Sequence, residues 1–172
     1  MTPTCYSDLM IEPSIALYGD AFDKVETLLE ELLKTTQSRY ALLVDRKGFV
    51  LVHKEALWAP RPPSLDSIAT LIAGSSSATN ALAKILGESQ FDALVQEGKE
   101  ISLYVESASD LALLVILFDK KAPLGKVKLF AKKTAAEIAD TLEREKHAPR
   151  PELKLDQSFS SGATALLDDL FG

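Results

Sequence analysis

The side chains that most often carry out catalysis are scarce in this sequence. Its 172 residues include one cysteine, Cys5, and two histidines, His53 and His147. We interpret Cys5 as an inert thiol in an N-terminal arm and His53 as a polar residue at the end of an edge strand. His147 falls at the end of a helical pattern, where a cationic side chain suits the helix dipole. So few cysteines and histidines cannot build the usual kind of zinc site.

Sequence motifs for nucleotide binding and hydrolysis are missing as well. The sequence contains no G-x-x-x-x-G-K-[ST] phosphate loop, no H-E-x-x-H and no G-x-S-x-G. The acidic pairs Glu30-Glu31 and Asp168-Asp169 are expected to be solvated rather than to act as acid–base couples. We therefore predict no catalytic residue, no metal site and no cofactor.

Charge and composition narrow the class of protein further. Lysine and arginine total 19 against 25 for aspartate and glutamate, a net charge of −6, which argues against a nucleic-acid binder. The stretch from Lys120 to Lys133 is nevertheless rich in lysine. We interpret it as a solvated helix face, with an electrostatic docking patch as the alternative.

The longest apolar run, Leu111 to Phe118, is far shorter than the roughly 20 residues of a membrane span. A single cysteine fits a reducing compartment, so we expect a cytoplasmic protein.

Hydrophobic periodicity predicts helices that alternate with pairs of strands. Apolar residues at helical spacing predict a first helix from Asp20, as its N-cap, to about Gln37. A second helix, capped by Ser64, is predicted from Leu65 to about Gly87, because glycine suits a helix end.

The strand patterns are those of antiparallel hairpins. Gly48 is expected to supply a positive φ in the turn of the first hairpin. The run 90–97 is ambiguous between strand and helix. The predicted strands are 40–44, 49–53, 101–106 and 111–118.

Residues 123–144 allow two interpretations. Locally, Lys126 to Lys132 alternates like a strand, but apolar residues from Leu124 to Leu142 fit one helical face over a longer window. Length favours a helix from Pro123 to about Arg144. Single helices around hairpins predict an α+β domain with a mainly antiparallel sheet.

The second helix carries two rows of residues. We expect its large apolar residues to face its own sheet: Ile68, Ile72, Leu82 and Leu86. A row of small residues at spacing four would let another backbone approach closely. That row is Ala69, Ala73, Ser77 and Ala81, with Gly74 and Ala78 beside it. From spacing alone, a partner surface and packing within the chain are equal alternatives.

Several strings in this order resemble the roadblock family of small dynein-light-chain-like domains, and within it the bacterial members that partner an MglA-type Ras-like GTPase. They span about Leu17 to Leu142. The strings are 41–48 (ALLVDRKG), 71–74 (LIAG), 81–88 (ALAKILGE), 113–119 (LLVILFD) and 123–129 (PLGKVKL).

The resemblance implies the fold and the assembly. It implies a five-stranded antiparallel sheet with the helix 64–87 on one face and the other two helices on the opposite face. It makes 90–97 the third strand and 123–144 a helix. It also implies a homodimer that pairs the central helices and joins two sheets into one.

The resemblance further implies the function. The protein would be a GTPase-activating protein in bacterial cell polarity and gliding motility, enriched at a cell pole. It would reshape the GTPase without inserting an arginine, and it would also influence nucleotide exchange. The alternative is a roadblock scaffold that binds a GTPase or another partner without stimulating hydrolysis. In either case the protein would have no active site of its own. The implied GTPase-binding residues are Ala73, Gly74, Ser77, Ala78 and Ala81.

The sequence therefore divides into three parts. We predict an N-terminal arm (1–18), a roadblock domain (19–147), and a linker with a C-terminal amphipathic helix (148–172). The tail string 165–171 (ALLDDLF) also resembles that bacterial subgroup. It implies that the apolar residues of this helix contact a second surface of the GTPase: Leu166, Leu167, Leu170 and Phe171.

Overall fold

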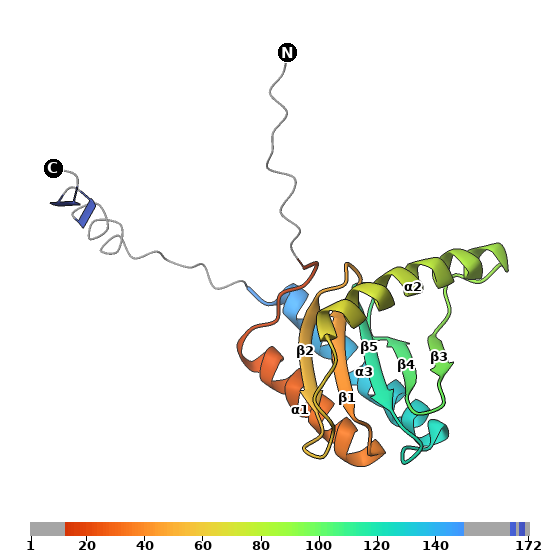
Figure 1. Ribbon diagram of the computed structural model, residues 1–172. Helices are drawn as coiled ribbons and strands as arrows, with labels where there is room; N and C mark the ends of the chain where they lie inside the picture. The colour runs from red at the N-terminus through yellow and green to blue at the C-terminus, as the bar shows by residue number, and fades with distance from the viewer. Residues whose placement is uncertain (1–12, 150–165, 168, 171–172) are drawn as a thin grey trace.

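The computed structural model describes residues 13–149 together with 166, 167, 169 and 170. Within them one sheet lies between helices, with α1 and α3 on one face and α2 on the other (Figure 1). This confirms the predicted α+β architecture. The elements are α1 (Gly19–Thr36), β1 (Tyr40–Asp45), β2 (Val50–Glu55), α2 (Leu65–Ile85), β3 (Ala93–Glu97), β4 (Ser102–Ser107), β5 (Ala112–Phe118) and α3 (Leu124–His147).

The sheet has the order β2-β1-β5-β4-β3, and every neighbouring pair is antiparallel. The central strands β1 and β5 are buried along their whole length, because helices cover both faces. β3 forms one edge, which confirms the strand interpretation of this ambiguous run. β2 forms the other edge and carries His53 exposed, as predicted.

The turn between β1 and β2 is a compact structure built around Asp45. Its carboxylate accepts backbone N–H groups of Lys47 at 2.9 Å and Phe49 at 3.0 Å. Gly48 has the predicted positive φ, 96°. A Cβ at Gly48 would lie 2.9 Å from the backbone Cα of Thr70 in α2, so this turn also sets how closely α2 approaches.

The larger core lies between the sheet and helices α1 and α3. Leu29 and Ile138 are fully buried there. The predicted N-cap of α1 is wrong, because Asp20 lies inside the first turn and Tyr18 precedes the helix without a side-chain capping bond. An acidic residue in the first turn still suits the positive end of the helix dipole. α3 is helical throughout, so the alternative strand at Lys126–Lys132 does not form.

Helix α2 packs on the sheet mainly through its N-terminal half. Ser64 caps it, accepting the N–H of Ser67, and Gly87 ends it at a φ of 85°, as predicted. Ala69 and Ile72 are buried against β1 and β5. The small-residue row therefore begins as packing within the chain.

The expectation that Leu82 and Leu86 face the sheet is wrong, since their side chains are 50% and 65% exposed. The 21 residues of α2 make a helix about 31 Å long, whereas five strands span about 20 Å. The helix crosses the strands and extends beyond β3 (Figure 1). The C-terminal half of α2 therefore lies only partly over the sheet, and a complete apolar face cannot be buried there.

Candidate interaction surface

A groove lies between one side of α2, the end of β1 and strand β5. We call it the α2 groove. Its volume is about 400 Å³. The residues that line it are Arg46, Ala73, Ser76, Ser77, Asn80, Ala81, Lys84 and Leu113.

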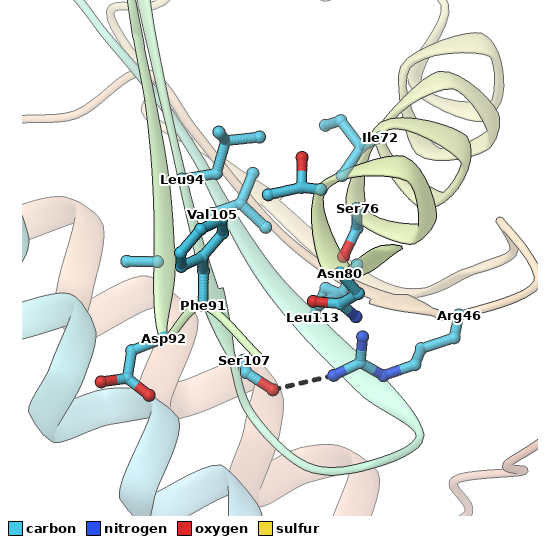
Figure 2. A pocket seen from close by; sticks show the side chains of 12 residues that line it. Arg46, Ile72, Ser76, Asn80, Phe91, Asp92, Leu94, Val105, Ser107 and Leu113 are labelled. Atoms are coloured by element: carbon cyan, nitrogen blue, oxygen red, sulfur yellow. Dashed lines mark hydrogen bonds between the residues drawn. The ribbon is translucent and has the colours of Figure 1, made fainter. Parts of the chain in front are cut away.

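The groove continues into a narrow inner pocket beneath α2 (Figure 2). Ile72, Val105 and Leu113 form part of its apolar wall. The inner pocket has a volume of about 20 Å³, enough for roughly one water-sized group. The inner pocket is therefore far smaller than typical ligand pockets, which measure about 300–1,000 Å³.

The residues predicted from the small-residue row fall on two sides of α2. Ala73, Ser77 and Ala81 line the α2 groove. Gly74 and Ala78 are exposed on a neighbouring face. That face also carries the large apolar side chains Leu71, Leu82 and Ile85, which we call the α2 stripe.

The electrostatics of the groove come from two residues that sequence reasoning missed. Nη2 of Arg46 donates to Oγ of Ser107 at 2.9 Å and to the carbonyl oxygen of Ser109 at 3.2 Å. Lys84 adds a second positive charge. No sequence period could have indicated Arg46, because only the packing of the β1–β2 turn against α2 brings it to the groove.

The loop 58–63 lies at the other end of the sheet. The buried Tyr40 hydroxyl donates to the carbonyl oxygen of Pro60, and burial raises the pKa of Tyr40. Lys121 lies 5.1 Å from the centre of the Trp58 ring. Six residues of β1, about 20 Å, separate Tyr40 from Arg46. The loop therefore does not border the α2 groove.

An ion pair joins the start of β1 to the end of β5. Nε of Arg39 lies 2.9 Å from Oδ2 of Asp119. Burial by itself raises the pKa of Asp119, but hydrogen bonds from the Lys121 backbone N–H and from Arg39 outweigh it and hold that pKa below its usual value. This charge is structural and lies outside the α2 groove.

The remaining predicted residues lie apart from the groove. The lysines of α3 are exposed, as a solvated helix face predicts. Leu166, Leu167 and Leu170 are exposed on the terminal helix, while Phe171 and Cys5 lie outside the described residues.

Within the described part of the chain, no cluster of three or more His, Cys, Asp or Glu is placed to hold a metal ion. None of the helices described here is long and apolar enough to cross a membrane.

An antiparallel five-stranded sheet, with two helices on one face and a long grooved helix on the other, defines an interaction domain of the roadblock class. Residues 24–118 match the family model of the Roadblock/LC7 domain, and the chain belongs to this family. Its members are non-enzymatic regulators.

Solved structures that resemble the chain include several MglB proteins of that family. The gliding protein MglB of Thermus thermophilus is 54% identical, with a TM-score of 0.76 over 78% of this chain and 99% of that one. An MglB with a tetrameric arrangement is also 54% identical, with a TM-score of 0.76 over 78% and 98%. Myxococcus xanthus MglB is 30% identical, with a TM-score of 0.66 over 72% and 98%. No match was found among curated protein sequences.

Proposed function

We propose that this protein is a homodimeric GTPase-activating partner of an MglA-type Ras-like GTPase. The observation that carries the proposal is the 54% identity to MglB, which extends over nearly the whole length of the MglB chain. The shape of α2 supports it, because a helix with a groove on one side and an exposed apolar stripe on another suits a domain with two different partners.

The first partner is a second copy of the chain. Leu71 and Ile85 of the α2 stripe are 72% and 81% exposed. Among the described strands, β3 leaves one edge of the sheet unpaired nearby. Proteins usually cover such edges, and a two-fold axis between two α2 helices would bury the stripe of each copy on the other.

The second partner is the GTPase, which we place across the α2 groove of the dimer. Ala73, Ser77 and Ala81 have short side chains, so the backbone of another protein can approach α2 closely. Gly74 and Ala78 extend this surface of short side chains toward the proposed two-fold axis of the dimer. Where the family resemblance leads one to expect Asn after the Ala-Gly pair, Ser75 stands here, which keeps the surface small but polar.

The proposed mechanism uses binding energy rather than an inserted side chain. Many activators insert an arginine that neutralises charge on the transferring phosphoryl group. Here Arg46 is tied back by Ser107 and Ser109, and Arg39 is paired with Asp119. A surface that binds the catalytic conformation of the GTPase more tightly than its resting conformation is enough to accelerate hydrolysis.

The C-terminal helix has a separate proposed role. Leu166, Leu167 and Leu170 are exposed, and an apolar face of this kind suits a contact with a second surface of the GTPase. We propose that this contact influences nucleotide exchange by the GTPase.

We also propose that the protein acts in cell polarity and gliding motility and is enriched at a cytoplasmic cell pole.

The test is the rate of GTP hydrolysis by the cognate GTPase with and without this protein. Stimulation is expected, and Ala81→Arg or Ser77→Arg should abolish it together with complex formation. Ala136→Arg, at an exposed position of α3 on the opposite side of the sheet, is the matched control. Binding without stimulation would support the scaffold alternative. Normal binding by both groove variants would show that the interface is misplaced.

A further inference from the structure

The α2 groove carries positive charge, and no carboxylate of the described part of the chain lines it. Arg46 and Lys84 both line it, and none of the other lining residues is acidic. Among the described residues, neither cation has a carboxylate within 4.0 Å. On a chain with a net charge of −6, two cations that have no carboxylate partner among the described residues line this groove.

Two acidic residues close to Arg46, Asp45 and Asp92, are directed elsewhere. Asp45 is adjacent to Arg46 in the chain, but its carboxylate accepts the backbone N–H groups of Ser14, Lys47 and Phe49. Asp92 lines only the inner pocket, and its carboxylate points away from Arg46 (Figure 2). Neither of these two carboxylates therefore forms an ion pair with Arg46.

The guanidinium of Arg46 is fixed in place yet retains free donors. Both of its hydrogen bonds leave from Nη2, to Ser107 and Ser109. Nε and Nη1 have no hydrogen-bond partner among the described residues. Figure 2 shows the guanidinium between Ser107 and Asn80, at the edge of the inner pocket. A guanidinium that is already ordered loses little conformational entropy when it binds a further acceptor.

We propose that the α2 groove binds a carboxylate side chain of the partner GTPase, with Arg46 as the anchoring residue and Lys84 as the second cation. This inference rests on the proposed function. Charge-assisted hydrogen bonds are shorter and about twice as strong as neutral ones, and they are strongest where water is partly excluded. The Asn80 amide and the Ser76 hydroxyl line the same groove and add neutral donors. The groove thus selects an acidic residue at one point of an otherwise small, uncharged surface.

The first experiment uses the free full-length protein and does not depend on the GTPase. The protein is titrated with N-acetylglutamate methylamide, and with the neutral glutamine analogue as a control, while NMR follows the Nε–H of Arg46 and the backbone N–H of Asn80. Saturable shifts at both positions with the glutamate probe, and at least tenfold weaker binding of the glutamine probe, are expected. Equal responses to the two probes, or no response, would overturn the proposal.

The second experiment measures the affinity for the GTPase bound to a non-hydrolysable GTP analogue, at 50 and 300 mM NaCl. At low salt, Arg46→Gln is expected to weaken binding about 10- to 100-fold and Lys84→Gln about 3- to 10-fold, and both losses should shrink at high salt. Lys128→Gln removes the same charge from an exposed position on α3 and should change the affinity less than twofold.

Two further results distinguish a direct contact of Arg46 with the GTPase from an indirect effect of Arg46 on the β1–β2 turn. Ser107→Ala removes a tie on Arg46 but keeps its charge, so the salt dependence of binding should be retained. If Ser107→Ala reproduces the loss seen with Arg46→Gln, Arg46 acts only by holding the turn, and the proposal fails. If the wild-type protein forms no complex at all, the proposed function fails, and the probe titration alone then decides the preference of the groove.

Discussion

Replacing Ile85 by serine removes the most exposed branched side chain of the α2 stripe. Ile85 is 81% exposed in the single chain. Full burial of an isoleucine side chain is worth about 1.5–3 kcal/mol, so covering the exposed part in a dimer is worth about 1.2–2.4 kcal/mol. A two-fold dimer contains the residue twice, which makes the total about 2.5–5 kcal/mol. The dissociation constant of the dimer should therefore rise by roughly two to three and a half orders of magnitude.

Sedimentation equilibrium over a wide range of protein concentrations measures this constant directly. The control is Leu129→Ser on α3, because Leu129 is also a large apolar residue, 67% exposed, but lies on the opposite side of the sheet. Leu129→Ser should leave the dimer unchanged. The reasoning is refuted if Ile85→Ser leaves the dissociation constant unchanged, or if the two variants weaken the dimer equally.

Three further predictions concern the stability of the fold, each measured by chemical denaturation. Because the pKa of Asp119 is held below its usual value, its stabilisation is present above about pH 4 and is lost as the pH falls through the folded-state pKa. Asp119→Asn should therefore destabilise the protein by about 1–2 kcal/mol at pH 7, and an equal gap at pH 3 would contradict this account. Gly48→Ala should lower the free energy of unfolding by about 1–3 kcal/mol, because its φ is positive and the new Cβ would meet Thr70, whereas wild-type stability would show that the turn relaxes freely. Ser64→Ala should lower it by about 0.5–1 kcal/mol through loss of the α2 cap, and no change would mean that the 3.4 Å capping bond contributes nothing.

The elements that bury a face within the chain were predictable from the sequence. The apolar run 111–118 and the apolar faces of α1 and α3 must be buried against other apolar residues, and in the structure they form the core with one another. The run 90–97 could not be assigned from its own pattern, and only the family resemblance made it a strand. Its short length and exposed edge explain this ambiguity, because β3 buries little that would impose a clear period.

The candidate site was predictable only in part. Periodicity shows that Leu82 and Leu86 need cover, but it cannot say whether that cover comes from the same chain. Spacing placed Ala73, Ser77 and Ala81 in one row, and all three line the α2 groove, but spacing left open whether that row faces a partner. Arg46 was not, because its position depends on how the β1–β2 turn packs against α2 rather than on any local pattern.

The length of α2 beyond its own sheet has a consequence for regulation. The half of α2 that carries Ser77 and Ala81 contributes no residue to the core beneath the helix, so we expect a partner that packs against it to add to its stability. If a second copy steadies this half on one side, the GTPase meets a helix that is already ordered on the other. Pairing of the copies and capture of the GTPase are then thermodynamically linked, and each strengthens the other by the same factor. Activation of the GTPase would accordingly rise more steeply than in proportion to the cellular concentration of this protein.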